Sequence, residues 1–192
     1  FLHQPTLADY LRNYYDKRNA VAESYAYGTQ KAKNTNLKQF AETIRFLEEQ
    51  DVRTPEQLTE KIQEFDTQLN EVSQRLKKQL AALQRVNVNL YAMKEYFETR
   101  PVYLELKNKY FGREKFKEEH KKELSGYYRS ERILKENLDA NGKIPEGKWK
   151  READCLSEEI AALRKEDKRI HAMLRKYEKV KNHVEVLMAE EG

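Results

Sequence analysis

Two long heptad runs constrain the fold of this chain more than any other feature of its sequence. In the first, apolar residues recur at alternating steps of four and three from Leu58 to Phe97, and eleven of the twelve positions are apolar. The second run extends from Trp149 to Met188 with the same alternation and two polar exceptions. Because a helix must cover such a stripe, we expect the two runs to fold back on each other as an antiparallel coiled coil.

Helix-start signals precede both runs. Thr54 can cap a helix, Pro55 suits its first position, and Gln57 can close a capping box. Pro101 predicts that the first helix ends or kinks there, and Pro145 predicts the start of the second. The two helices are therefore expected to be nearly equal in length.

Polar residues near the middle of the runs suggest how the two helices align. If Phe97 meets Trp149, then Gln79 lies level with residues 165–167. Gln79 and Asp167 would then be neighbours, and a buried polar pair can fix the alignment at some cost in stability. The alternative is that both side chains tilt to the surface.

The predicted fold is all-α, a long antiparallel coiled-coil hairpin with a small helical tip and two N-terminal helices packed at its base. With only six glycines, four prolines and 36% charged residues, the composition is typical of long helices joined by narrow apolar seams. No segment has a strand pattern. The predicted divisions are residues 1–53 for the N-terminal pair, 54–100 and 145–192 for the hairpin, and 101–144 for the tip.

The shorter helices are predicted from their end signals. Thr6 and Asp9 form a capping-box pattern, and Gly28 suits the end of that first helix. A polar connector is expected up to Asn36, followed by a second helix that stops near Gln50. In the tip we expect three short helices and an Asn-Gly turn, at residues 101–110, 113–124, 127–138 and 141–142.

The sequence contains no recognisable catalytic or metal-binding pattern, so we predict a protein that is not an enzyme and binds no cofactor or metal. His120 lies beside Glu119 and Glu123, but a solvated helix face explains this group better than a metal site. Cys155 has no local histidine partner and is expected to be a half-buried packing residue. The tyrosines without a nearby base or metal motif are expected to pack: Tyr14, Tyr15, Tyr127 and Tyr128.

Basic residues concentrate on the two predicted long helices. Residues 72–94 contain five cations and no acid, although the net charge of the whole chain is only +4. Such a belt could bind DNA phosphates in a salt-dependent manner, or it could be the charged outer face common to coiled coils. Lysines in the tip alternate with aromatic residues, which suits base stacking, but acids are also abundant there. The ten candidate phosphate-binding residues are Arg75, Lys77, Lys78, Arg85, Arg164, Lys165, Lys168, Arg169, Arg175 and Lys176.

The expected location is the cytoplasm. A single cysteine excludes an internal disulfide and suits a reducing compartment. No apolar run is long enough to insert into a membrane, and no signal peptide is recognisable. Because the chain begins at Phe1 rather than at a methionine, we expect it to be part of a longer protein.

Several short motifs occur in a distinctive order. Residues 36–49 read Asn-Leu-Lys-Gln-Phe-Ala-Glu-Thr-Ile-Arg-Phe-Leu-Glu-Glu, and residues 99–103 close the first heptad run with Thr-Arg-Pro-Val-Tyr. A Lys-Phe pair at 115–116 and Glu-Glu-His at 118–120 precede the second run. This order resembles the C-terminal region of bacterial relaxases, or mobilisation nucleases, of conjugative and mobilisable elements. The likeness covers most of residues 6–188.

The resemblance implies an accessory region. In relaxases a separate N-terminal domain nicks DNA with a tyrosine nucleophile and a metal held by histidines, and no matching motif allows those roles to be assigned here. The resemblance implies that the chain helps to engage single-stranded or hairpin DNA during conjugative transfer. A protein-docking module for a coupling protein or another transfer component is the alternative, and a coiled-coil dimeriser is a third. Nearly equal helix lengths favour an intramolecular hairpin, hence a monomer or weak dimer.

Overall fold

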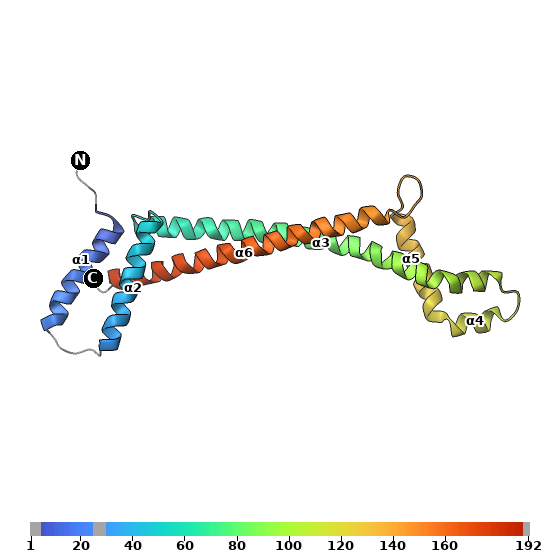
Figure 1. Ribbon diagram of the computed structural model, residues 1–192, viewed down its shortest axis with the longest axis horizontal. Helices are drawn as coiled ribbons and strands as arrows, with labels where there is room; N and C mark the ends of the chain where they lie inside the picture. Colours follow the sequence, from blue (N-terminus) through green and yellow to red (C-terminus); the bar gives the residue numbers. More distant parts are fainter. Residues whose placement is uncertain (1–4, 25–29, 190–192) are drawn as a thin grey trace. The chain divides into compact units, whose positions relative to one another are not determined.

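The structure is a computed structural model that describes residues 5–24 and 30–189, with side chains described for 5–17 and 37–189 (Figure 1). Over these residues the chain forms six helices and no strand, which confirms the predicted all-α class. The helices are α1 (Leu7–Ser24), α2 (Gln30–Glu49), α3 (Pro55–Asn108), α4 (Arg113–Glu119), α5 (Lys121–Glu136) and α6 (Glu146–Ala189).

Contacts between the helices divide the chain into two compact units. Unit 1 comprises Phe1–Glu71 and Asp167–Gly192, and unit 2 comprises Val72–Glu166. Helices α3 and α6 therefore each contribute one segment to unit 1 and another to unit 2.

Capping boxes begin α1 and α3, as the sequence predicted. The Asp9 amide donates to Thr6 Oγ1 at 3.2 Å, and the Thr6 amide donates to Asp9 Oδ2 at 3.0 Å. At α3 the Gln57 amide donates to Thr54 Oγ1 at 3.4 Å, and the Thr54 amide donates to Gln57 Oε1 at 3.3 Å. Each pair satisfies amides that have no partner within the first turn of a helix, and so fixes where the helix starts.

Two predicted helix boundaries were wrong. Helix α2 already begins at Gln30, so the connector expected up to Asn36 is helical. That segment has neither glycine nor proline, and its lysines, alanine and glutamine favour helix. Helix α3 continues through Pro101 to Asn108. Burial of Leu106 in unit 2 helps to offset the backbone hydrogen bond that the proline lacks. The end expected at Gly28 lies outside the described residues.

The short helices of the tip also differ from those predicted. The break between α4 and α5 falls at His120, and Gly126 lies inside α5 rather than between two helices. A Cβ atom added to Gly126 would lie 3.0 Å from Glu95 Oε1, so the glycine lets α5 approach α3 closely. The predicted Asn-Gly turn is present, with Gly142 at a φ of 71° and the Asp139 amide donating to the Lys143 carbonyl at 2.9 Å.

Unit 1 is built on one apolar cluster shared by four helices. Leu11 of α1, Leu47 of α2 and Leu58 of α3 are all fully buried in it. The rings of Phe65 and Tyr177 are 5.3 Å apart, while Leu58 lines a shallow cavity with Val184. Within this unit the start of α3 therefore runs antiparallel to the end of α6.

A polar contact lies at the edge of this cluster. Thr43 Oγ1 and His183 Nδ1 share a hydrogen bond of 2.8 Å, and the Phe40 ring meets the imidazole edge-on. Burial, with a smaller effect of nearby Lys179, lowers the pKa of His183. The fold therefore favours the neutral imidazole.

Unit 2 has a core made by α3, α5 and α6. Val86 and Ala92 of α3 are buried in one cluster with Leu134 of α5 and Trp149 of α6. Beside it, the Tyr127 ring stacks on the rings of Tyr96 and Tyr103, with centroid distances of 5.3 Å and 4.0 Å. A smaller cluster of Leu106, Phe116 and Leu124 joins α3, α4 and α5.

The predicted alignment of the two heptad runs was wrong. Gln79 Nε2 donates to Glu159 Oε2 at 2.5 Å, about two helical turns before the residues expected opposite it. The expectation started from a Phe97–Trp149 contact, but Phe97 is 53% exposed while Trp149 lies in the cluster with Val86. Within unit 2 the α3 and α6 segments still run antiparallel, because Gln79 faces Glu159 and the later residues of α3 meet the start of α6.

Candidate functional site

All ten predicted phosphate-binding side chains are exposed. They belong to both compact units, because both long helices contribute to each unit. Unit 2 holds Arg75, Lys77, Lys78, Arg85, Arg164 and Lys165, and unit 1 holds Lys168, Arg169, Arg175 and Lys176.

These ten cations lack acidic partners among the described residues. None of them takes part in a salt bridge there, and Arg85 Nε makes only a 3.4 Å hydrogen bond to the Ala81 carbonyl. On α3 the helical spacing explains this for Lys77, Lys78 and Arg85, which have no carboxylate three or four positions away. Glu71 lies four positions before Arg75, but the two form no salt bridge. A hydrated cation of this kind can exchange water and counterions for a phosphate without first breaking an ion pair.

Lysines in the tip have a different environment. Lys117 Nζ lies 2.7 Å from Glu114 Oε1, and Lys115 Nζ lies 3.8 Å from Glu119 Oε1. The hydrogen bond and charge of Lys117 hold the pKa of Glu114 below its usual value. Acidic neighbours therefore already neutralise part of the positive charge in the tip, as the abundance of acids in its sequence suggested.

Exposed aromatic rings occur where the tip was expected to offer base stacking. Tyr110 and Phe111, between α3 and α4, are 92% and 90% exposed. Phe116, the third ring of that pattern, is only 5% exposed, and Lys109 Nζ lies 4.7 Å from its centroid. Two of the three rings are thus accessible to a base.

The remaining candidate residues make structural contacts. His120 packs on Phe116 with the ring centroids 4.3 Å apart, and its Nδ1 lies 3.7 Å from Glu123 Oε1. In the part of the chain that the structure describes, no three His, Cys, Asp or Glu side chains are grouped closely enough to hold a metal ion. Cys155 was expected to be half-buried but is exposed, with Sγ 3.9 Å from Glu159 Oε1, because it lies on the outer side of the adjacent seam residue Leu156.

The four tyrosines expected to pack do so to different extents. Tyr14 and Tyr15 contact the Phe40 ring, and Tyr127 is buried in its aromatic stack. Tyr128 is 52% exposed and meets Tyr103 only edge-on. Burial and the neighbouring Tyr96 raise the pKa of Tyr127, so its hydroxyl is held in the neutral form.

Sequence reasoning missed an apolar groove on the outer side of α3 in unit 2. Leu80, Val88 and Tyr91 line it and are 38%, 46% and 64% exposed. Their spacing of eight and then three residues places them on one helix face, and this second stripe was the signal that could have been found. The heptad stripe beside it has the stronger pattern, and it was the only stripe considered as an apolar face of this helix.

Comparison of the chain with protein-family models, curated proteins and solved structures finds no match. Across residues 5–24 and 30–189, no helix combines the length and apolar content needed to cross a bilayer. The exposed cations and the apolar groove are therefore the two surfaces from which a function can be argued.

Proposed function

We propose that this chain is a non-catalytic accessory region of a bacterial relaxase, and that it binds DNA during conjugative transfer. Exposed cations on α3 and α6 bind the phosphates of single-stranded or hairpin DNA. The relaxase assignment comes from the order of the sequence motifs, while the DNA-binding role is supported by the charged surface. Under this proposal the region acts in the cytoplasm and takes its catalysis from a separate nuclease domain.

The proposal includes a continuous antiparallel coiled-coil hairpin formed by α3 and α6. Two local observations support it, since segments of these helices run antiparallel in unit 1 and again in unit 2. In both units residues of the α3 heptad seam pack against α6 of the same chain, although Phe97 at the end of the seam is 53% exposed. A seam that is filled within one molecule supports a monomer or a weak dimer rather than an obligate coiled-coil dimer.

The absence of ion pairs at the ten cations, over the described residues, is the observation that carries the DNA-binding proposal. An exposed lysine that pairs with a carboxylate has a competitor for any phosphate, although such pairs are individually weak. The ten candidate cations have no competitor of this kind among the described residues, and all ten are exposed. They therefore supply the electrostatic, counterion-releasing part of nucleic-acid binding.

Fluorescence anisotropy with labelled single-stranded and hairpin DNA across a salt series tests the proposal. The test variant replaces Arg75, Lys78, Arg85 and Arg164 by glutamine. If all four contact phosphates, the slope of log affinity against log salt should fall by roughly 3 for single-stranded DNA. The affinity at low salt should fall at least about tenfold.

The matched control removes the same charge from the same unit. It replaces Lys115, Lys117, Lys135 and Lys150, each of which has a carboxylate partner, by glutamine. We expect the control to change DNA affinity by less than about threefold. Equal losses in the two variants would contradict the proposed site, and no binding by the unaltered chain at low salt would contradict the function.

The second candidate function is a docking module for a coupling protein or another component of the transfer apparatus. The apolar groove on α3 favours it, because contiguous exposed apolar side chains are typical of interaction surfaces. The apolar side chains that line the groove are distinct from the ten cations.

A further inference from the structure

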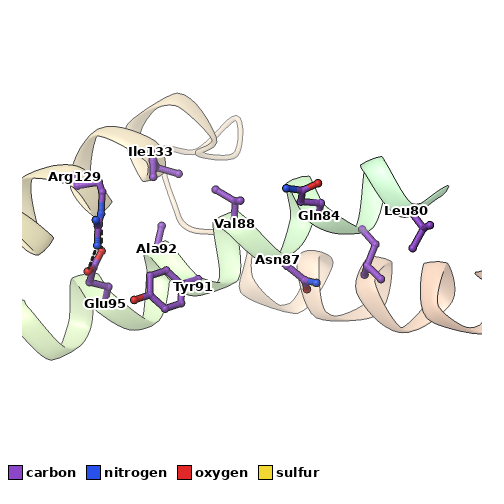
Figure 2. Close-up of a pocket in the computed structure, with 10 residues that line it drawn as sticks. Leu80, Gln84, Asn87, Val88, Tyr91, Ala92, Glu95, Arg129 and Ile133 are labelled. Carbon is purple, nitrogen blue, oxygen red and sulfur yellow. Dashed lines mark hydrogen bonds and ion pairs between the residues drawn. The ribbon is translucent and has the colours of Figure 1, made fainter. Parts of the chain in front are cut away.

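The groove in unit 2 lies where α5 stops covering α3. Its volume is about 530 Å³, and its walls come from one face of α3 and from Ile133 of α5. Figure 2 shows Ile133 above Ala92 and Val88, with the Arg129–Glu95 ion pair at one end of the groove. Ala92 is only 1% exposed, whereas Val88 is 46% exposed. Helix α5 therefore buries this face of α3 at Ala92 but leaves it exposed from Val88 toward Leu80.

The uncovered stripe lies beside the heptad seam of α3, and the seam residue Leu83 lines the edge of the groove. The seam residues Val86 and Leu90 pack in the core with Trp149 of α6. Leu80, Val88 and Tyr91 face outward instead, and Tyr91 is 64% exposed. A second apolar stripe on a helix whose first stripe is already buried is a surface for another apolar element.

The shape of the groove suits a helix. Its apolar residues lie along one face of α3, which a partner helix can match with side chains spaced by three and four residues. Helix α5 already packs on the adjoining part of this face through Ile133 and Leu134. Glu95 is compensated by Arg129, so this end of the groove presents no uncompensated acid.

The charges around the groove indicate which charge a partner helix should carry. Lys77 lies seven residues before Gln84, which lines the groove, and therefore on the same face of α3. Lys78 and Arg85 align in the same way with Ala92. Residues 72–94 contain no acid, and Glu95 at the end of the groove is paired with Arg129, so the α3 side of the groove carries a net positive charge.

The positive charge also distinguishes three possible partners of the groove: a second copy of the chain, single-stranded DNA and an acidic helix. A second copy of the chain, placed symmetrically on the groove, would bring the cations of both copies together at a cost in affinity. Single-stranded DNA would satisfy the cations, but Tyr91 is the single ring among the apolar side chains that line the groove, and Leu80 and Val88 offer its bases no further stacking surface. A helix with an apolar stripe flanked by Asp and Glu satisfies both the apolar walls and the basic margins.

We propose that this groove on α3 and α5 binds an acidic amphipathic helix of a partner protein. The apolar stripe of the partner lies along Leu80, Val88 and Tyr91, and its carboxylates lie near Lys77, Lys78 and Arg85. This inference shares Lys77, Lys78 and Arg85 with the DNA-binding proposal but does not rest on it, because the apolar walls take no part in phosphate binding.

Direct binding of designed peptides tests the inference. The probe is a fluorescein-labelled helical peptide of about 20 residues, with leucines along one face and glutamates on both sides of them. Two controls carry lysines in place of the glutamates, or the same residues in scrambled order. We expect the acidic peptide to bind at least about tenfold more tightly than either control.

A pair of matched variants locates the binding. Replacing Val88 and Tyr91 by serine should weaken binding of the acidic peptide at least about tenfold. Replacing Tyr110 and Phe111 by serine removes a comparable exposed apolar surface elsewhere in unit 2 and should leave peptide binding unchanged. All four side chains are exposed, so helix content measured by circular dichroism should be unaffected in both variants.

Three outcomes would overturn the inference. The first is equal binding of the acidic, basic and scrambled peptides, or no binding of any of them. The second is a sedimentation mass of a dimer that returns to the monomer in the Val88→Ser, Tyr91→Ser variant, because a second copy would then occupy the groove. The third is an equal loss of DNA and peptide affinity in that variant, which would assign the groove to nucleic acid. Unchanged DNA binding would keep the two proposals separate.

Discussion

The two compact units use α3 in opposite ways. In unit 1 the segment around Leu58 is sealed by residues from α1, α2 and α6, and Leu58 itself is fully buried. In unit 2 α6 covers one stripe of α3 and α5 covers part of another, while Leu80, Val88 and Tyr91 remain exposed. Helices α1 and α2 help to bury α3 in unit 1. In unit 2 helix α5 covers only part of the outer face of α3, so the rest of that face is surface.

This difference separates stability from binding. A residue in a sealed cluster contributes chiefly to the free energy of unfolding, because its removal leaves a cavity. A residue on an uncovered stripe contributes little to that free energy and is free to meet a partner. Unit 1 should therefore respond to substitution mainly through stability, and the outer face of unit 2 mainly through binding.

The largest expected effect comes from shortening one aliphatic side chain in each unit. Leu58→Ala in unit 1 should lower the free energy of unfolding by about 2–5 kcal/mol, because Leu58 is fully buried. Val88→Ala in unit 2 should change it by less than about 0.5 kcal/mol, because alanine favours helix and Val88 is 46% exposed. Urea denaturation followed by circular dichroism measures both, and similar losses would refute the contrast between sealed and open faces.

A smaller effect is expected from pH in unit 1. Burial lowers the pKa of His183, so the unfolded chain takes up the proton first as the pH falls below about 6.5. The free energy of unfolding should therefore decrease below that pH, by less than about 1.4 kcal/mol per pH unit, until the folded imidazole also protonates. Above that pH the contribution is constant.

Thermal unfolding between acidic and neutral pH measures this effect. His183→Gln should abolish the part of the pH dependence that the imidazole causes, and Thr43→Val should reduce stability at every pH by removing its hydrogen-bond partner. His171→Gln, at an exposed histidine of the same unit, controls for the histidine-to-glutamine replacement itself. An identical acid-side slope in the unaltered chain and the His183 variant would contradict the assignment.

The smallest expected effect concerns the aromatic stack around Tyr127 in unit 2. It tests whether this stack excludes water as the apolar cluster around Tyr177 in unit 1 does. Burial raises the pKa of Tyr127, as it raises that of Tyr177 in unit 1. Since the unfolded phenol ionises first, stability should fall at alkaline pH above about 10. Tyr127→Phe should remove the latest step of a tyrosinate absorbance titration and cost less than about 1 kcal/mol at neutral pH. An unchanged titration would mean that the stack is open to water.

Local signals in the sequence predicted much of the secondary structure. Both capping boxes, at Thr6 and Thr54, formed as expected because their hydrogen bonds join residues only three positions apart. The Asn-Gly turn also formed, since Gly142 alone supplies the positive φ that the turn needs. Pro101 was predicted to end or kink its helix and Gly126 to lie between two helices, but both lie inside helices, because their tolerance depends on packing that no local pattern records.

By itself the sequence determined that this chain is helical, that its heptad stripes must be buried, and that residues 72–94 carry positive charge without acids. The tertiary structure alone decided that Gln79 meets Glu159, that Gly126 lets α5 approach Glu95, and that one face of α3 is left uncovered. The physical reason is that helix formation and charge depend on neighbours along the chain. Alignment and coverage depend instead on the fit of side chains from segments that are distant in sequence.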